Sequence, residues 1–472
     1  MTSAKPARLS ALDAGFLEAE DSDRHASLAI GAVAVLEGPP PDMESFVSTI
    51  DERVRRIPRC TQVLRSHPFD LSAPEWVHDQ AFDVRHHVRR AAVAQPGDDA
   101  AMYRVVADLM ERRLDRDRPL WECWLVEGLA NERWALVIKV HHSVADGIAA
   151  STMISAMCDG ESVEDIPDLL SNDPSDHNHG RSLPNLNPLS WLTGAWNASL
   201  GTARSAWRVT SGAAEIASGI LYPTSQGMTG PLTGMRRYAA ARVSLADVRS
   251  ICHRFDVTVN DVALAAIADS FREAMLRRGE KIRPDSLRTL VPVSLRKPDE
   301  LNIPDNRVSV MLPLLPVELA DPLQRLRAVH ERMTQSKSSG QSQAGSIMIS
   351  VSNLLPFALT AWTVRLLTRL PQRGVVTVAT NVPGPRERVT VMGRTVHSLM
   401  PIPPIAVHLQ LGIAITSYAD ELTFGVIGDF DAVVNPDELA AGIDAGIKRL
   451  VSVTKACKRS RRMGNQLLLL TS

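Results

Sequence analysis

A strand that ends in two consecutive histidines constrains this 472-residue chain more than any other feature. Over residues 135–140, apolar side chains occupy every second position, which is the period of a β-strand, and the run ends at His141 and His142. Asp146 and Gly147 follow in a predicted turn, and a predicted helix begins after them. An HHxxxDG string arises by chance in a chain of this length only about once in a thousand sequences, because histidine is rare. The stretch therefore predicts a chemically active turn.

The chemistry of histidine explains why such a turn would exist. Histidine titrates near neutrality, so it can take a proton from a hydroxyl group and return it within one catalytic cycle. That role requires a fixed ring, and Asp146 can hydrogen-bond to the local backbone while Gly147 supplies a positive φ angle for the turn. We therefore predict that His142 is a general base, that His141 supports it, and that Asp146 orients the turn.

These residues and their neighbours also have other interpretations. A single buried histidine is more often a hydrogen-bonded core residue, and that interpretation stays open for His141. No cysteine or second histidine cluster lies nearby at the spacing of zinc ligands, so no metal site is predicted. Ser143 lacks a GxSxG elbow and is not expected to be a nucleophile. His86 and His87 lack a following Asp-Gly turn and are expected on the surface.

The HHSVADG stretch resembles the signature of the acyl-CoA-dependent acyltransferase superfamily, which includes chloramphenicol acetyltransferase and the condensation domains of peptide synthetases. Further stretches narrow the resemblance to the bacterial wax ester synthase/diacylglycerol acyltransferase family. They occur in the family's order and are LSALDAGFL (9–17), DRPLWE (117–122), TVNDVALA (258–265), VPVSLR (291–296), NVPGP (381–385) and SYADELTFGVIGD (417–429). The resemblance therefore covers nearly the whole chain.

The resemblance implies an α/β fold of two chloramphenicol acetyltransferase-like domains, each with a mixed sheet flanked by helices, with a tunnel between them. We expect an N-terminal acyltransferase domain over residues 1–178, which carries HHSVADG. An interdomain linker with helices is expected over residues 179–234, and a C-terminal acyltransferase-like domain over residues 235–472. The length suits two domains, and the polar, Pro-rich stretch 165–187 has the composition of a linker.

The function that the resemblance implies is transfer of a long-chain acyl group from acyl-CoA to diacylglycerol, giving triacylglycerol, or to a long-chain alcohol, giving a wax ester. Acyl-CoA would be a co-substrate, and no bound cofactor is expected. Two alternatives stay open. One is an acyltransferase or condensation enzyme of the same fold that uses another acceptor or a carrier-bound donor. The other is a non-catalytic lipid-droplet binding protein, which the intact HHSVADG disfavours.

The resemblance also suggests further site residues. Pro119, Leu120 and Trp121 are expected in the wall of the tunnel, and an anchor for the following strand is an equally good interpretation. Arg296 is expected to pair with Asp146, as the superfamily pairs its motif aspartate, although a plain surface arginine is about as plausible.

The Asn-Asp motif lies at the start of a long predicted helix over residues 258–278. Thr258 is expected to cap this helix, and Asp261 suits its first turn because a carboxylate there is favourable against the helix dipole. Asn260 is different, because an amide facing the tunnel could donate a hydrogen bond to a developing oxyanion or contact substrate.

Composition bounds the partners and the compartment. Lys plus Arg (52) nearly equals Asp plus Glu (53), which argues against a nucleic-acid binder. The five cysteines form no CxxC motif, and the first 17 residues hold no long apolar segment. These features predict reduced thiols, no secretory signal and a cytoplasmic protein.

One apolar segment and one basic segment suggest contact with lipid. Residues 338–364 carry no charge, but Pro356 interrupts them. We expect peripheral contact with a membrane here, with a buried core helix and a membrane span as the alternatives. The basic run 455–462 could contact anionic lipid, although a disordered tail is the default. The predicted location is the cytoplasm, peripherally on the inner membrane or on lipid droplets.

Overall fold

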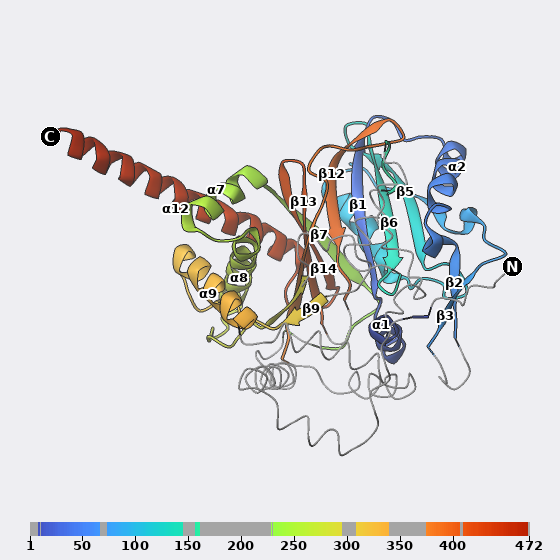
Figure 1. The fold of residues 1–472 in the computed structure, drawn as a ribbon, viewed down its shortest axis with the longest axis horizontal. Helices are drawn as coiled ribbons and strands as arrows, with labels where there is room; N and C mark the ends of the chain where they lie inside the picture. Colours follow the sequence, from blue (N-terminus) through green and yellow to red (C-terminus); the bar gives the residue numbers. More distant parts are fainter. Residues whose placement is uncertain are drawn as a thin grey trace, which may run out of the picture.

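The computed structural model describes residues 8–9, 11–66, 73–144, 156–160, 228, 230–294, 308–338, 374–405 and 409–470. Within these ranges the chain forms two six-stranded sheets that stand side by side, and a separate two-stranded sheet (Figure 1). Asp146, Gly147 and Arg296 lie outside the described residues, as does almost all of the uncharged segment 338–364.

The first sheet has the strand order β11-β12-β1-β6-β5-β4. Its strand β6 (Arg133–His141) is antiparallel to β1 (Ala29–Glu37) on one side and to β5 (Trp121–Leu129) on the other. Strand β4 (Val88–Ala92) pairs with β5 in parallel. Every residue of β6 after the first is buried, so the prediction of a buried strand ending at the histidines is confirmed.

The α-helices described in the N-terminal half are α1 (Ala11–Ser22), α2 (Met43–Val54) and α3 (Asp99–Glu111). Helix α2 begins where Asp42 accepts a hydrogen bond from Ser45 N at 2.9 Å, the usual role of an N-cap aspartate. Its buried residues recur at spacings of four and are Phe46, Ile50 and Val54. The separate two-stranded sheet is formed by β2 (Gln62–Arg65) and β3 (Glu75–His78).

The second sheet is mixed, with the strand order β7-β14-β13-β10-β8-β9. Strand β14 is antiparallel to both β7 and β13. Strand β10 is parallel to both β13 and β8, and β9 is antiparallel to β8. In sheet order the strands are β7 (Arg236–Ser244), β14 (Glu421–Asp429), β13 (Leu411–Tyr418), β10 (Thr377–Pro383), β8 (Thr289–Ser294) and β9 (Val308–Met311).

Among the described residues, helices lie to one side of the second sheet, on the left in Figure 1: α7 (Leu245–Phe255), α8 (Val259–Arg277), α9 (Pro322–Ser338) and α12 (Pro436–Leu470). Helix α8 contacts the other three, and its residues 261–271 are all buried. Burial on several sides explains why residues 262–268 of this helix are all apolar. The second half of α12 extends away from the rest of the molecule (Figure 1).

Two strands from the C-terminal half complete the first sheet. After β11 (Thr390–Val391), β12 (Arg394–Ile402) pairs with β1 and also contacts β13 and β14 of the second sheet. The two sheets approach so closely here that a Cβ on Gly425 would lie 1.7 Å from the Pro401 carbonyl oxygen. The Tyr238 hydroxyl donates to the same oxygen at 3.0 Å. Strand β12 therefore joins the two sheets.

Arg236 of β7 forms a second link between the halves, and a buried ion pair holds its side chain. Arg236 lies 3.2 Å from Asp429, and both side chains are almost fully buried. The Arg236 guanidinium also donates to the His25 carbonyl, and its backbone N–H donates to the Glu111 carboxylate at 2.9 Å. The division by sequence places all of residues 235–472 in one domain, whereas β12 pairs with the first sheet and Arg236 contacts Glu111 and His25 of the N-terminal half.

Candidate functional site

The two histidines lie where β6 ends, and hydrogen bonds from two neighbouring segments fix their backbone. His141 N donates to the Leu120 carbonyl at 3.0 Å, and His142 N donates to the Leu28 carbonyl at 2.9 Å. Val144 N then donates to the His141 carbonyl at 2.9 Å, which begins the turn. Because both histidine N–H groups are paired, the strand end holds the two side chains in defined directions.

His141 is buried, with 1% of its surface exposed. Its Nδ1 accepts the backbone N–H of Ser143 at 3.1 Å and lies 2.7 Å from Ser143 Oγ. In a neutral ring the proton is therefore on Nε2, which lies 3.5 Å from Glu20 Oε2. Contacts at both ring nitrogens fix the orientation of His141, and Ser143 contributes by holding the ring.

Glu20 is a site residue that the sequence did not single out. Its carboxylate is buried, accepts the backbone N–H of Leu28 at 3.1 Å and pairs with Arg116 at 2.8 Å. Burial alone would raise the pKa of Glu20, but its interactions with His141, and then with Arg116 and Leu28, lower that pKa to about 2. The carboxylate beside His141 is therefore ionised at neutral pH.

The sequence around Glu20 carries one local sign that this residue has a distant partner. Helix α1 has no basic residue in its last turn, yet Glu20 and Asp21 lie there, where the helix dipole disfavours negative charge. Two arginines in the segment that follows α3 neutralise this unfavourable negative charge. Arg116 pairs with both carboxylates, and Arg113 donates to the carbonyls of Glu20, Asp23 and Ala26. Acidic residues at a helix C-terminus thus mark a long-range interaction.

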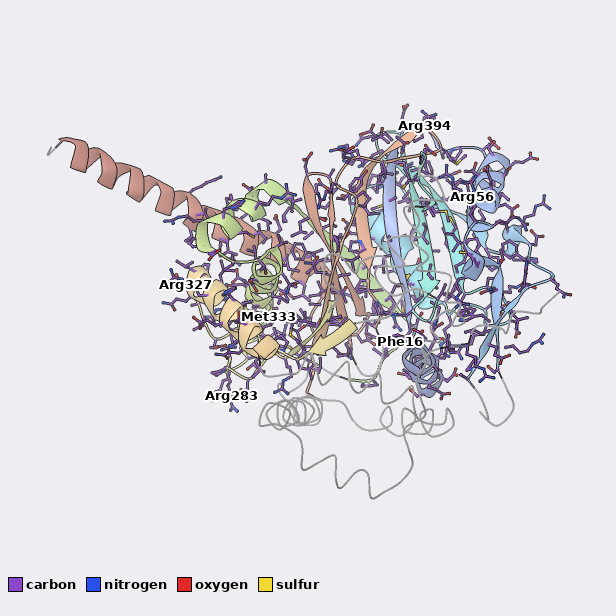
Figure 2. All side chains as sticks on the ribbon, in the orientation of Figure 1. Phe16, Arg56, Arg283, Arg327, Met333 and Arg394 are labelled. Atoms are coloured by element: carbon purple, nitrogen blue, oxygen red, sulfur yellow. The ribbon has the colours of Figure 1, made fainter. Side chains whose placement is uncertain are left out.

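His142 is half-buried and is the more accessible of the two histidines. Its ring lies against the Phe16 ring, with 4.2 Å between centroids and a 32° angle between planes. Phe16 is on α1, below the two sheets in Figure 2, so α1 contacts both histidines through two of its side chains. This arrangement suits a reactive His142 that is supported by a buried His141.

Lys139 anchors the histidine strand from the same face as His141. Its ammonium is fully buried and donates to the Leu109 carbonyl at 2.8 Å and to the Arg112 carbonyl, at the C-terminus of α3. A cation at a helix C-terminus is favourable against the dipole. Burial lowers the pKa of Lys139 to about 8. The contact fixes α3 against β6 two residues before His141.

The segment beyond the histidine turn is anchored by Asp159. Its backbone N–H donates to the Thr390 carbonyl at 2.7 Å, and its carboxylate accepts the N–H groups of Met392 and Gly393 at 2.9 and 2.7 Å. Arg53 of α2 pairs with the same carboxylate at 2.5 Å. Residues 156–160 are thus tied to the turn between β11 and β12.

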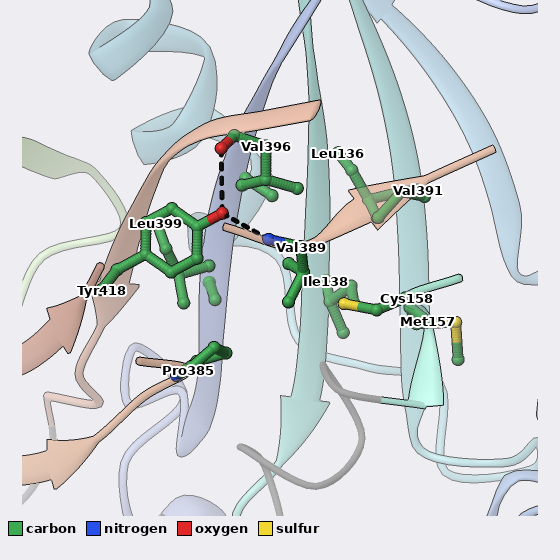
Figure 3. Close-up of a pocket in the computed structure, with 12 residues that line it drawn as sticks. Leu136, Ile138, Met157, Cys158, Pro385, Val389, Val391, Val396, Leu399 and Tyr418 are labelled. Atoms are coloured by element: carbon green, nitrogen blue, oxygen red, sulfur yellow. Dashed lines mark hydrogen bonds between the residues drawn. The ribbon is translucent and has the colours of Figure 1, made fainter. Parts of the chain in front are cut away.

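A small apolar cavity, called the seam below, lies against this segment, which contributes Met157 and Cys158 to its lining (Figure 3). The volume of this cavity is about 20 Å³, which is enough for one water molecule. The Tyr418 hydroxyl borders it, accepting from Val389 N at 3.1 Å and donating to the Val396 carbonyl at 2.9 Å. The remaining lining residues are apolar: Ala32, Ala34, Leu136, Ile138, Met157, Cys158, Pro385, Val391 and Leu399. The seam is a packed contact between the first sheet and residues of the C-terminal half.

Pro119, Leu120 and Trp121 are buried beside the histidine strand. Trp121 Nε1 donates to the Cys60 carbonyl at 2.8 Å, so Trp121 acts as the predicted anchor of β5. Pro119 and Trp121 also line a cavity of about 340 Å³. Whether that cavity belongs to a catalytic tunnel stays a prediction. His87 is not on the surface: it is 3% exposed and its ring stacks on Trp121, so that expectation was wrong.

The start of α8 matches the predicted cap. Thr258 accepts the backbone N–H of Asp261 at 3.2 Å, and Asp261 accepts that of Thr258 at 2.9 Å. Asp261 also lies 2.8 Å from Nδ1 of His330 on α9, so its structural role is confirmed. Asn260 is half-buried in the first turn. Its oxyanion or substrate role stays a prediction, as do the roles of Asp146, Gly147 and Arg296, which lie outside the described residues.

Two protein-family profiles match this chain. The wax ester synthase/diacylglycerol acyltransferase catalytic domain matches residues 9–263, and the C-terminal domain of the same family matches residues 305–451. The chain is 50% identical over 461 residues to the probable diacylglycerol O-acyltransferase tgs1 of Mycobacterium tuberculosis. That similarity covers 97% of this chain and 98% of the relative.

Solved structures confirm the fold class. A wax ester synthase/diacylglycerol acyltransferase from Marinobacter aquaeolei is similar with a TM-score of 0.64 at 23% identity, over 95% of this chain and 100% of that chain. The first condensation domain of the CDA synthetase is similar with a TM-score of 0.58 at 14% identity, over 96% and 97%. The expected two-domain α/β acyltransferase architecture is therefore confirmed.

Proposed function

The chain belongs to the wax ester synthase/diacylglycerol acyltransferase family and is an acyltransferase, and we propose that it transfers a long-chain fatty acyl group from acyl-CoA to diacylglycerol. The product is triacylglycerol, a storage lipid. The name of the relative with 50% identity supports diacylglycerol as the first acceptor to test. A long-chain alcohol is the second acceptor, and a wax ester is then the product.

One observation carries the assignment of the base. The two adjacent histidines differ in environment: His141 is buried between Ser143 and the ionised Glu20, whereas His142 is half-buried at the strand end. A buried ring with both nitrogens in contact is suited to support, and a fixed but accessible ring is suited to proton transfer. We therefore assign the base to His142 and the support to His141 and Glu20.

The proposed reaction proceeds without a covalent acyl-enzyme. His142 takes the proton of the acceptor hydroxyl, and the oxygen attacks the thioester carbonyl carbon. The C–S bond then breaks, and the coenzyme A sulfur leaves with the proton that His142 returns. No bound cofactor or metal is needed, because the thioester supplies the activated acyl group and the acceptor supplies the nucleophile.

Three further residues have proposed roles in this scheme. Asp146 orients the turn and pairs with Arg296, which keeps His142 in place. Asn260, at the positive end of the α8 dipole, donates a hydrogen bond to the oxyanion that forms on the thioester carbonyl. Removal of one such donor typically costs about a hundredfold or more in kcat.

Both proposed lipid substrates are poorly soluble, so we place the enzyme in the cytoplasm at the surface of the inner membrane or of lipid droplets. Among the described residues, no helix is both long enough and apolar enough to cross a membrane. Peripheral contact through residues 338–364 or the basic run 455–462 is the proposed mode.

The test measures coenzyme A release from palmitoyl-CoA by the purified protein, with diacylglycerol or hexadecanol as acceptor. His142→Asn keeps polarity and approximate size but removes the base, and we expect acceptor-dependent release to fall by about a hundredfold or more. His253→Asn on the exposed side of α7 is the matched control and should leave the rate unchanged.

Each outcome has a defined meaning. The acceptor with the higher kcat/KM identifies the preferred product. Unchanged release by His142→Asn would rule out the base assignment. No release with either acceptor would favour a carrier-bound donor, which the similarity to a condensation domain makes the next donor to test, or a lipid-binding role without catalysis.

A further inference from the structure

A cavity of about 340 Å³ lies beside the edge of the first sheet, one strand away from the histidines. Its lining is mostly polar and comes from the segment before β4, from β4, from the segment that leads into β5 and from the start of β5. Its charged residues are Arg85, Arg89, Asp115, Arg118 and Glu122, and His86 and His87 lie beside them. Leu120, whose carbonyl accepts His141 N, lies between two of the lining residues. The cavity is therefore connected to the histidine strand by a direct backbone contact.

The charges in this cavity leave a cationic excess. Arg89 lies 3.5 Å from Glu122, and Arg118 lies 3.3 Å from Asp115. Among the described residues, no carboxylate lies within ion-pair distance of the exposed Arg85. Three guanidinium groups thus share two carboxylates, and one positive charge is left for an anion.

His86 adds a further hydrogen-bond donor. Arg118 contacts Nδ1 of His86, and a guanidinium can only donate, so Nδ1 carries a lone pair. The neutral His86 ring then has its proton on Nε2. A guanidinium and an imidazole in contact without a carboxylate between them form a donor pair that an anionic oxygen can bridge.

His87 supplies a hydrogen-bond acceptor to the same cavity. Its ring stacks against Phe82 and against Trp121, at centroid distances of 5.5 and 4.6 Å. Its Nδ1 is 2.9 Å from the Trp121 carbonyl, which can only accept, so Nδ1 carries the proton and Nε2 of the neutral ring is an acceptor. Burial lowers the pKa of His87, which keeps the ring neutral. The cavity thus combines cationic donors with one buried acceptor.

We propose that this cavity binds a phosphate-bearing ligand, and that the ligand is the nucleotide end of acyl-CoA. The cationic side chains would bind phosphate oxygens, and His87 would accept a hydrogen bond from a hydroxyl or amino group of the nucleotide. The volume is near the lower end of ligand pockets, about 300–1,000 Å³, and suits one end of a long ligand. The pantetheine arm separates this end from the thioester, so the cavity need not adjoin His142. This inference rests on the proposed function.

The first experiment is calorimetric titration of the full-length protein with coenzyme A. Arg85→Gln and Arg118→Gln remove charge at exposed or partly exposed positions, and we expect each to raise Kd by about ten- to a hundredfold. Arg327→Gln, at an exposed position on α9 (labelled in Figure 2), is the matched control and should not change Kd. An unchanged Kd in both cavity variants would overturn the proposal.

Kinetics separate this inference from the proposed function. The cavity variants should raise KM for palmitoyl-CoA with little change in kcat, because the nucleotide contacts are the same in the ground state and the transition state. If the native protein turns over palmitoyl-CoA but the variants keep its KM, the cavity assignment fails alone. If the native protein shows no turnover but the variants weaken coenzyme A binding, the proposed function fails and the cavity assignment stands.

A phospholipid headgroup carries the same chemistry, and a third arm tests it. The protein is sedimented with vesicles of phosphatidylglycerol and phosphatidylcholine at a ratio of about one to three, and with pure phosphatidylcholine. The proposal expects Arg85→Gln and Arg327→Gln to bind the anionic vesicles equally. Loss of vesicle binding in Arg85→Gln with an intact Kd for coenzyme A would overturn the assignment to acyl-CoA.

Discussion

Substitution of Glu20 by glutamine tests the support of His141 through stability. The change keeps the shape of the side chain but removes the charge beside the His141 ring. It also leaves Arg116 without the buried carboxylate that it contacts at 2.8 Å. Both effects destabilise the folded state, whereas the unfolded chain loses only a solvated carboxylate.

The magnitude follows from the pKa. The folded environment lowers the pKa of Glu20 from its ordinary value of 4.5 to about 2. One pKa unit corresponds to about 1.4 kcal/mol, so ionised Glu20 contributes roughly 3 kcal/mol to the free energy of unfolding at pH 7. A carboxylate with a lowered pKa stabilises the folded state above its unfolded pKa. That contribution falls as the pH drops from about 4.5 towards about 2.

The assay is urea unfolding followed by tryptophan fluorescence at several pH values. We expect Glu20→Gln to lower the free energy of unfolding by roughly 3 kcal/mol at pH 5 to 7, with a gap that narrows below about pH 4.5. Glu52→Gln removes an exposed carboxylate paired with Arg56 and should cost less than about 1 kcal/mol. Equal stability of Glu20→Gln and the native protein at pH 7, or a gap that stays constant down to pH 3, would refute the reasoning.

Three other changes test the contacts between the halves and the packing of the core. Gly425→Ala would place a Cβ 1.7 Å from the Pro401 carbonyl oxygen, so we expect a loss of about 3 kcal/mol or more, seen as a lower Tm; an unchanged Tm would contradict the close approach. Arg236→Gln leaves Asp429 buried without its charge partner and should cost about 3–5 kcal/mol in urea unfolding, while a cost below about 1 kcal/mol would show that the pair is solvated. Burial raises the pKa of the Cys123 thiol, so iodoacetamide at pH 8 should label it only in urea, and labelling of the native protein would argue against its burial.

The parts of the fold that the sequence predicted are those with a local pattern. Alternating apolar residues identified the strand before His141, and the Thr258 cap with Asp261 identified the start of α8. The chemical character of His142 is likewise local, because it depends on a residue type at the end of a strand. Such features depend on neighbours within a few residues, which a single sequence displays.

The features that the sequence did not predict depend on distant partners. Glu20 and His141 lie 121 positions apart in the sequence, and the local pattern around either residue does not identify the other as its partner. His87 is buried because Phe82 and Trp121 stack against its ring, whereas its own segment is polar. Strand β12 has the pattern of an ordinary strand, and its membership of the first sheet depends on the path of the chain.

The position of β12 has a consequence for synthesis of the chain on the ribosome. Strand β1 has β6 on one side and β12 on the other, and 261 residues separate the end of β6 from the end of β12. At a synthesis rate of about 5–20 residues per second, one edge of β1 stays unpaired for roughly 10 to 50 s before β12 has been made. During that time an apolar strand of nine residues has an open edge, which is the form most prone to pairing with other nascent chains. The N-terminal half is therefore expected to depend on chaperones until β12 has left the ribosome.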